Sequence, residues 1–160
     1  MQKISPCLWF DSQAEEAAEF YVSLFKNSKL GNVLRYDAES AKVSGQAEGS
    51  VLTMEFELDG QSFTAMNGGP LFKFSEAVSL MIDCEDQAEV DHFWDALTKD
   101  GEESQCGWLK DKFGLSWQIV PKQLNKLMSG ADPVKTQKVM HALLQMKKLD
   151  LAALEAAYNS

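Results

Sequence analysis

The order of predicted elements repeats once along the chain, and this repeat limits the fold more than any single motif. The first half begins with a strand over Ile4 to Phe10 and a helix over Ala14 to Phe25, followed by three strands. The second half begins with a strand over Ala77 to Cys84 and a helix that ends near Lys99, followed by three more strands. The repeat period of roughly 70 residues is far longer than that of a solenoid. We therefore expect an α+β fold with two copies of one β-α-β-β-β unit.

Alternating apolar residues and turn signals define the remaining strands. Leu52, Met54, Phe56 and Leu58 share one face of a strand over Ser50 to Leu58. The dipeptide Asp59-Gly60 is typical of a two-residue hairpin turn. The other strands are expected at Lys29 to Tyr36, Gln61 to Asn67, near Glu102 to Gln105, Trp108 to Lys110 and Leu115 to Val120. Residues 37–49 are small and polar and are expected to form a long loop.

The hairpin between Cys106 and Pro121 is the most strongly marked part of the second half. Its turn is Asp111-Lys112-Phe113-Gly114, in which Asp opens a tight turn and Gly supplies the positive φ that closes it. Pro121 has no N–H for a strand ladder, so the second strand ends there. The segment is therefore predicted to form a β-hairpin.

The two predicted helices each carry an apolar stripe at helical spacing. In the first helix the apolar positions are Ala17, Phe20, Tyr21, Leu24 and Phe25. In the second they are Val90, Phe93, Trp94 and Leu97. Each helix is expected to cover one face of a sheet.

The C-terminal segment, residues 122–160, is predicted to be helical. A first short helix ends at Gly130, a second begins at Asp132-Pro133 and a third is capped by Asp150. Their apolar stripes require a partner surface, either on the same chain or on a second subunit.

Length and composition indicate one ordinary globular domain. The chain has 160 residues, 45% of them hydrophobic, which suffices for a core without disulfides. We expect a single domain, 1–160, with a first module at 1–70, a second at 71–121 and the C-terminal helices at 122–160.

Charge and apolar runs exclude several classes of partner. The formal net charge is −9 and no run of Lys or Arg occurs, which argues against nucleic-acid and anionic-membrane partners. The N-terminal residues lack the apolar region of a secretory signal, and no apolar run approaches the roughly 20 residues that span a bilayer. A cytoplasmic protein is expected.

Cysteines and histidines offer no recognisable metal or redox motif. Cys7, Cys84 and Cys106 include no C-x-x-C pair and are expected to be reduced, small, buried hydrophobic residues. His92 and His141 both fall on predicted helices without the spacing of a zinc site. Surface or capping roles are expected for both.

Polar residues on two strands are candidates for a site, and each has a structural alternative. Gln118 alternates with Trp117 and Ile119, so it lies either on a solvated face, as a satisfied buried amide, or in a pocket wall. Glu55 and Glu57 share one strand face; if that face lines a cavity, Glu55 is a general-base candidate. Phe72 and Phe74 form either a lid over a pocket or the seam between the two halves.

The chain also resembles a known superfamily along most of its length. Paired β-α-β-β-β units resemble the vicinal oxygen chelate superfamily, which includes glyoxalases, bleomycin-resistance proteins and extradiol dioxygenases. More narrowly, the chain resembles the PhnB-like family, often labelled 3-demethylubiquinone-9 3-methyltransferase domains. The matching segments are Leu8–Asp11, Ala14–Ala17, Phe20–Tyr21, Glu55–Gly60, Asn67–Pro70, Phe72–Phe74, Cys106–Asp111, Ser116–Pro121 and Met146–Asp150.

The resemblance implies four metal-ligand positions, and the residues there are unusual. They fall near Ser5 or Pro6, at Ala65 or Met66, at Ser79 and at Gln118. None of these is an imidazole or a carboxylate, and neutral amide and hydroxyl groups bind transition metals weakly. We therefore predict that the superfamily metal site is absent.

The methyltransferase label lacks a physical counterpart in the sequence. A Rossmann-type methyltransferase has a glycine-rich loop between a parallel strand and a helix. The chain offers no such loop.

The leading functional prediction is the binding of a small organic ligand in a cleft between the modules, with no metal and no other cofactor. The candidate ligand-binding residues are Gln118, Ser116, Asn67, Trp9, Trp108 and Phe72. The alternatives are a glyoxalase-like or dioxygenase-like metal-dependent lyase or isomerase, a metal-free acid–base enzyme using Glu55, and a dimeric interaction module without a ligand. The resemblance further implies a homodimer.

Overall fold

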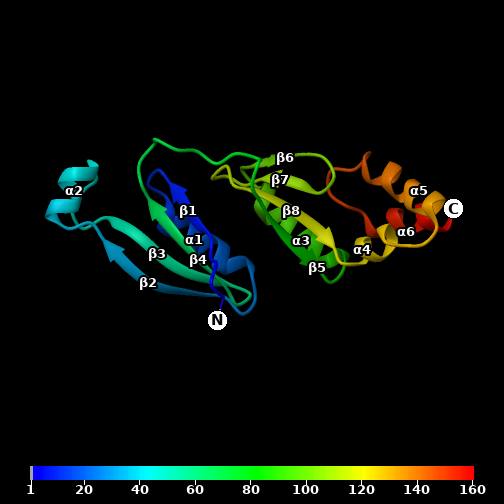
Figure 1. Cartoon of the computed structure of the whole chain (residues 1–160), viewed down its shortest axis with the longest axis horizontal. Coiled ribbons are helices and arrows are strands. Elements are labelled where there is room, and N and C mark those ends of the chain that lie inside the picture. Colours follow the sequence, from blue (N-terminus) through cyan, green and yellow to red (C-terminus); the bar gives the residue numbers. More distant parts are fainter. Residues whose placement is uncertain (1) are drawn as a thin grey trace. The chain divides into compact units, whose positions relative to one another are not determined.

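The computed structural model describes residues 2–160, which fall into two compact units that divide between Phe74 and Ser75. The elements of the first unit are β1 (Cys7–Phe10), α1 (Ala14–Leu24), β2 (Lys29–Arg35), α2 (Ala38–Ser44), β3 (Val51–Leu58) and β4 (Gln61–Asn67). Those of the second are β5 (Ser79–Cys84), α3 (Gln87–Thr98), β6 (Glu102–Glu103), β7 (Trp108–Lys110), β8 (Ser116–Pro121), α4 (Gln123–Met128), α5 (Pro133–Leu143) and α6 (Leu151–Asn159) (Figure 1). The predicted α+β repeat is confirmed.

The first unit is a four-stranded sheet covered on one face by α1. Its strand order is β1-β4-β3-β2, with β1 parallel to β4 and the other pairs antiparallel. Met54, Phe56 and Leu58 are buried, and the Phe56 ring lies 6.3 Å from that of Tyr21 on α1. Asp59 and Gly60 both have positive φ, as the predicted hairpin turn requires.

The expectation of a loop over residues 37–49 is wrong in part, because α2 forms there. Asp37 and Ser40 make a capping box: the Ser40 N–H donates to Asp37 Oδ1 at 2.8 Å, and the Asp37 N–H donates to Ser40 Oγ at 3.0 Å. Gly45 ends the helix with a φ of 75°. This short helix has little apolar periodicity, so only its capping residues in the sequence indicate that a helix forms there.

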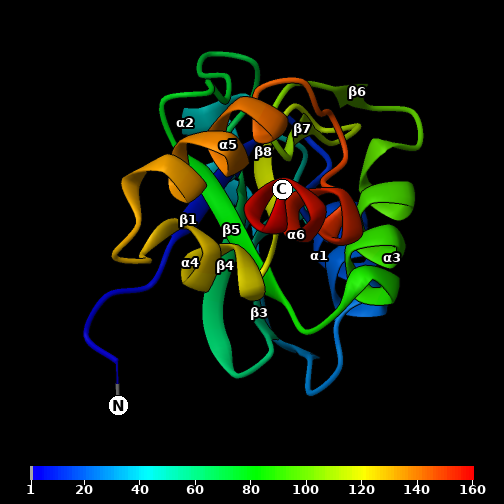
Figure 2. The same ribbon diagram turned by 90° about the vertical axis from the view of Figure 1, so that its right-hand side faces the viewer.

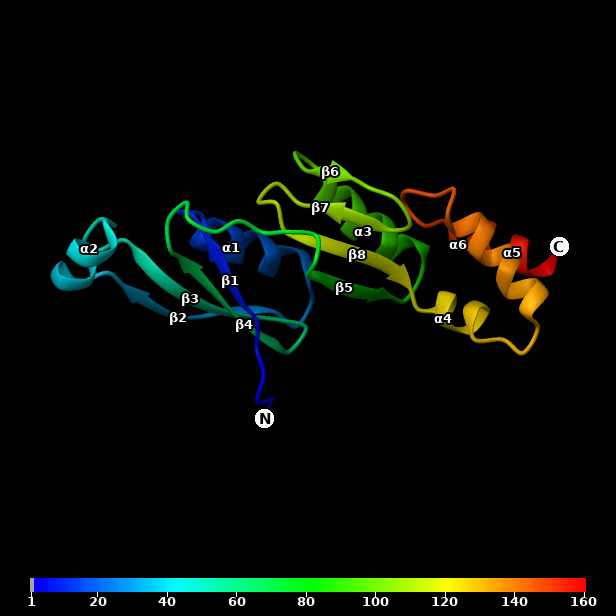
Figure 3. The ribbon, with the colours of Figure 1, turned by 45° about the horizontal axis from the view of Figure 1, so that its top comes forward.

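The second unit repeats the arrangement with α3 on one face of its sheet. Its strand order is β5-β8-β7-β6, with β5 parallel to β8, as Figure 3 shows. All four predicted apolar residues of α3 are buried, and α3 packs on β5, β7 and β8. Trp117 and Ile119 are buried as well. Since alternate residues of a strand point to opposite faces, Ser116 and Gln118 lie on the face opposite α3.

Asp111 fixes the β7–β8 turn through both oxygens of a buried carboxylate. Its Oδ1 accepts hydrogen bonds from the N–H of Phe113 at 2.9 Å and of Leu115 at 3.1 Å, and its Oδ2 accepts one from Trp117 Nε1 at 2.9 Å. The residue is only 3% exposed, and Gly114 has the predicted positive φ. The turn therefore depends on one side chain that also binds the indole of Trp117 on β8.

Helices α4, α5 and α6 form a small apolar cluster on the second unit. Figure 2 shows the three helices gathered beside the ends of β5 and β8. Val120 of β8 packs there with Leu124, Val139, Leu149 and Leu154, all of them buried. The apolar stripes of these helices thus find their partner surface within their own unit.

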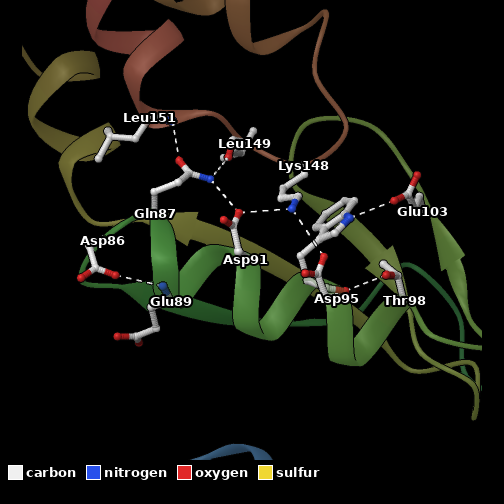
Figure 4. Close-up of polar contacts among 11 residues, drawn as sticks. Asp86, Gln87, Glu89, Asp91, Asp95, Thr98, Glu103, Lys148, Leu149 and Leu151 are labelled. Atoms are coloured by element: carbon white, nitrogen blue, oxygen red, sulfur yellow. Dashed lines mark hydrogen bonds and ion pairs between the residues drawn. The ribbon is translucent and has the colours of Figure 1, made fainter.

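A short docking segment, residues 146–151, joins this cluster to α3 and to the hairpin. The Gln87 amide donates to the Leu149 carbonyl at 2.9 Å and accepts from the Leu151 N–H at 2.8 Å (Figure 4). Lys148 Nζ forms ion pairs with Asp91 Oδ1 at 3.2 Å and with Asp95 Oδ1 at 3.4 Å. On the hairpin side, the N–H groups of residues 106 and 107 donate to the carbonyls of residues 146 and 147. Hydrogen bonds therefore tie the docking segment to α3 and to the two residues that precede β7.

Candidate functional site

Two polar residues meet on the face of the second sheet opposite α3. Ser79 pairs with Ser116 between β5 and β8, and Gln118 Nε2 reaches diagonally to Ser79 Oγ at 2.9 Å. Trp108 on β7 lies directly opposite Gln118. The structure thus brings together three of the predicted site residues, Gln118, Ser116 and Trp108. They lie around Ser79, which the sequence analysis named only as one of the superfamily's metal-ligand positions.

Ser116 lines a pocket on this face, with a volume of about 210 Å³. We call this the Ser116 pocket. It is lined by Glu76, Glu102, Glu103, Ser104, Trp108, Leu109, Lys110 and Ser116. Ser116 is 1% exposed, and its Oγ has no hydrogen-bond partner within residues 2–160. A buried hydroxyl without a partner is unfavourable in a folded protein.

An ion pair between Lys110 and Glu76 stands in the Ser116 pocket. The hydrogen bond from Lys110 lowers the pKa of the Glu76 carboxyl, and the same bond raises the pKa of the Lys110 ammonium. Sequence reasoning missed both residues. Lys110 had a usable signal, since it alternates onto the same strand face as Trp108, whereas Glu76 lies in a connection without any pattern.

Glu55 lines a second pocket, on the face of the first sheet opposite α1. This pocket has a volume of about 330 Å³ and is lined by Ser5, Lys29, Gly31, Asn32, Glu55, Phe56, Glu57, Ser62, Phe63 and Thr64. Glu55 Oε2 accepts a 3.2 Å hydrogen bond from Asn32 Nδ2. Lys29 Nζ forms an ion pair with Glu57 Oε2 at 3.4 Å. Glu55 therefore meets the geometric condition set for a general base, because its strand face does line a cavity.

Two further predicted wall residues, Trp9 and Phe72, form an aromatic pair in the first unit. Their ring centroids lie 5.0 Å apart in an edge-to-face arrangement, and Trp9 Nε1 donates to the Gly69 carbonyl at 3.0 Å. Phe72 is 59% exposed. Phe74 packs in a similar way against Phe10, at 5.3 Å. Both phenylalanines thus pack on aromatic rings of β1.

Asn67 has a structural role in the fold rather than a place in an open pocket wall. Its Oδ1 accepts from the Ala14 N–H at 2.8 Å, at the start of α1, and its Nδ2 donates to the Val51 carbonyl at 3.1 Å. The Tyr36 hydroxyl donates to the Asn67 carbonyl. The side chain is buried and both ends of its amide bond within the protein, which leaves no group of Asn67 for a ligand.

The residues at the superfamily's metal positions do not fit a transition metal. Ser79 and Gln118 bond to each other through a hydroxyl and an amide. In the first unit, Ala65 is buried with Phe63 on the side of α1, while Ser5 is in the wall of the Glu55 pocket. Hydroxyl and amide donors are poor ligands for Zn²⁺, Fe²⁺ or Ni²⁺. No cluster of three or more His, Cys, Asp or Glu side chains occurs in the part of the chain that the structure describes.

The three cysteines differ in environment. Cys84 is buried, as predicted, and burial raises the pKa of its thiol to about 12, with Glu89 and Asp83 adding to the effect. Cys106 is half-buried, but the prediction of burial is wrong for Cys7, which is exposed on the edge strand β1. No helix among residues 2–160 is long and apolar enough to cross a bilayer.

Solved structures with the same paired units define the class of fold. The chain is similar to the PhnB protein of Bacillus cereus, whose name carries a 3-demethylubiquinone-9 3-methyltransferase description, with 36% identity and a TM-score of 0.67. That match covers 75% of this chain and 99% of the Bacillus chain. Protein PA1353 of Pseudomonas aeruginosa is 18% identical with a TM-score of 0.63, over 76% of this chain and 98% of that one. The fosfomycin resistance protein FosX of Listeria monocytogenes is 12% identical with a TM-score of 0.52, over 81% and 98%. The last two likenesses show the vicinal oxygen chelate fold alone.

The sequence comparison places the chain within one family of that class. The family model described as 3-demethylubiquinone-9 3-methyltransferase matches residues 2–120. The chain therefore belongs to this PhnB-like family of the vicinal oxygen chelate superfamily. A search among curated proteins gave no match. The match ends at residue 120, so helices α4 to α6 lie outside the matched region.

Proposed function

We propose that this protein binds a small organic ligand on the face of the second sheet opposite α3, with Gln118 as its polar anchor and without a metal ion. The observation that carries this proposal is the state of the Gln118 amide. Its Nε2 is held by Ser79, while its Oε1 has no hydrogen-bond partner within residues 2–160. An oriented, half-buried acceptor beside an indole ring suits a site in which few polar groups fix a mostly apolar ligand.

The surroundings of Gln118 support binding rather than a purely structural role. A structural amide of the same type, Asn67, uses both its donor and its acceptor within the protein. Gln118 uses only its donor, and Trp108 faces it across the strand pair. Asn67 is buried and Gln118 only half-buried, so the acceptor of Gln118 is open to solvent and can bind a ligand.

The methyltransferase activity in the family's name is not part of this proposal. A Rossmann-type cofactor site needs a glycine-rich turn between a parallel strand and a helix. Between β1 and α1 the chain has Asp11-Ser12-Gln13, and between β5 and α3 it has Glu85-Asp86. Neither connection contains glycine.

A thermal-shift screen of organic compounds tests the proposal, because a ligand that binds only the folded state raises the melting temperature. The best compound is then titrated by calorimetry into wild-type protein and into Gln118→Ala. We expect Gln118→Ala to weaken binding by about tenfold, as the loss of one hydrogen bond in a site implies. Gln137→Ala, an exposed change on α5, is the matched control and should bind like wild type.

Two results would count against ligand binding on this face. Equal affinity of Gln118→Ala and Gln137→Ala would place any ligand elsewhere. A complete screen without any stabilising compound would favour the third reading, an interaction module without a ligand.

A second candidate function, a metal-free acid–base enzyme, rests on the Glu55 pocket. Glu55 lines a cavity together with Glu57 and with the hydroxyl residues Ser5, Ser62 and Thr64, so a substrate there would meet two carboxylates and several hydroxyls. In this case Glu55→Gln should abolish turnover and leave the melting temperature unchanged. Glu48→Gln, in an exposed connection, is its control. Equal turnover of the two variants would remove Glu55 from consideration.

We further propose that the protein is cytoplasmic and forms a homodimer. The subunit mass is 17.8 kDa, so light scattering of the purified protein distinguishes monomer from dimer directly. A monomer at all concentrations would contradict the homodimer.

A further inference from the structure

The Ser116 pocket contains a polar atom that the protein leaves unsatisfied. Ser116 lines the pocket and is 1% exposed, and its buried Oγ has no hydrogen-bond partner among residues 2–160. A buried hydroxyl without a partner costs about 1–3 kcal/mol relative to a satisfied one. Replacement by Ala at this position would avoid that cost, so the serine suggests that a partner binds in the pocket.

The pocket also carries a net negative charge, because its carboxylates outnumber its ammonium groups. Its ionisable side chains are three carboxylates and one ammonium. Lys110 is paired with Glu76, and Glu103 accepts a 3.0 Å hydrogen bond from Trp94 on α3. Glu102 lies directly across the β6–β7 pair from Lys110, and its charge adds to that of Glu76 in raising the pKa of the Lys110 ammonium. Glu102 forms no salt bridge with Lys110 among the described residues, so its carboxylate can still accept a hydrogen bond from a bound cation.

Trp108 supplies an aromatic wall in the same pocket. An ammonium group is attracted to the face of an indole ring, and the attraction grows as the group loses water. A hydroxyl acceptor, a carboxylate and an indole together match a protonated amine better than a carboxylate or a phosphate, which Glu76 and Glu102 would repel.

We propose that the Ser116 pocket is a subsite for the ammonium group of the ligand, with Ser116 and Glu102 as acceptors and Trp108 as the wall. This inference rests on the proposed function, since Ser116 and Gln118 lie on one face of β8. The pocket volume of about 210 Å³ is smaller than that of a complete drug-sized site. It therefore takes one end of a molecule whose remainder contacts Gln118.

Charge variants of the pocket test the sign of the ligand charge. The probes are n-butylammonium, neutral n-butanol and n-butyrate, titrated into the whole protein and followed by the amide and indole NMR signals of Trp108. We expect the signals to move with butylammonium alone. Glu102→Gln should weaken its binding about two- to fivefold, and Lys110→Met should tighten it by a similar factor. Glu155→Gln, an exposed change on α6, should leave it unchanged.

Ser116→Ala gives a readout that a structural role would not produce. Without ligand, this variant should melt roughly 2–4 °C above wild type, because the unsatisfied hydroxyl is gone. It should nonetheless bind butylammonium about three- to tenfold more weakly. A lower melting temperature together with unchanged binding would show that the hydroxyl serves the fold through a bound water only, and would overturn the proposal.

The outcomes separate this inference from the function on which it rests. If butyrate binds in preference to butylammonium and Lys110→Met abolishes that binding, the cationic subsite is wrong. If a screened ligand depends on Gln118 but not on Ser116 or Glu102, ligand binding stands and the amine subsite fails.

Discussion

Gln118 donates a 2.9 Å hydrogen bond to Ser79 across the parallel pair of β5 and β8. The family resemblance assigns both positions to metal ligands. Here the Gln118 amide donates to the Ser79 hydroxyl, and the Gln118 Oε1 has no hydrogen-bond partner among residues 2–160. The same pair of positions can therefore support a polar anchor for an organic ligand.

This relationship predicts that metal binding can be restored by changing donor chemistry alone. The double variant Ser79→His/Gln118→Glu places an imidazole and a carboxylate at positions that already contact each other. We expect it to bind Zn²⁺ at least about tenfold more tightly than either single variant. Titration with a zinc indicator measures this. Equal affinity of all three variants would mean that the strand geometry itself is unsuited to a metal.

Asp111 should be one of the most sensitive residues of the second unit. Asp111→Ala leaves the N–H groups of Phe113 and Leu115 and the indole N–H of Trp117 without their acceptor. Bonds to a charged group are stronger than average, so we expect a loss of roughly 3 kcal/mol in the free energy of unfolding. Urea denaturation measures it, with the exposed change Glu48→Ala as control. A loss no larger than that of the control would contradict the described turn.

The docking segment should depend on Gln87 more than on Lys148. Gln87→Leu leaves a carbonyl and an N–H of the segment without partners, at residues 149 and 151. We expect a loss of about 2 kcal/mol and faster hydrogen exchange of the Leu151 N–H. Lys148→Met removes only partly exposed ion pairs and should cost less than about 1 kcal/mol. The reverse order would show that charge, and not the amide, holds the segment.

The same network predicts a pH dependence. The hydrogen bond from Gln87, followed by the bond and charge of Lys148, lowers the pKa of the Asp91 carboxyl below its ordinary value of 3.8. A carboxyl with a lowered folded-state pKa adds stability above its unfolded pKa and loses it as the pH falls through the folded pKa. The stability difference between wild type and Lys148→Met should therefore be constant from pH 7 to pH 5 and shrink below pH 3.8. A difference that grows on acidification would reverse the assigned sign.

Gly68 should be needed for the position of Trp9. A Cβ at Gly68 would overlap the Trp9 ring, whereas a Cβ at Gly49 meets no atom within 4 Å. Gly68→Ala should therefore destabilise the protein by about 1–3 kcal/mol and shift its tryptophan fluorescence to longer wavelength. Gly49→Ala serves as the comparison, because it carries only the strain of a φ of 84°. Equal effects of the two changes on fluorescence would show that Trp9 does not pack on this turn.

Strand alternation, helical spacing and turn dipeptides made most of the fold predictable from the sequence. The face of α3 and the turns at Asp59-Gly60 and Asp111 to Gly114 follow from local rules that tertiary contacts here reinforce. Helix α2 could not be read from periodicity, since it depends on the caps at Asp37 and Gly45. Local rules and global fold agree wherever apolar residues are regularly spaced.

The candidate site was predictable only in part. Alternation correctly placed Gln118 and Ser116 on one strand face, and the register added Trp108 opposite. The role of Asn67 depends on Ala14, 53 positions away in sequence, and no local pattern indicates such a partner. Whether a polar residue serves the fold or a ligand is decided by its hydrogen-bond partners, which the sequence does not specify.

The central claim, a metal-free organic ligand anchored by Gln118, is tested most directly by native mass spectrometry combined with elemental analysis. The experiment compares wild type, Gln118→Ala and Gln137→Ala, each mixed with the best compound of the thermal-shift screen. We predict a metal-free protein that retains the compound in wild type and Gln137→Ala and loses it in Gln118→Ala. A stoichiometric transition metal in wild type, or equal retention of the compound by all three proteins, would contradict the account.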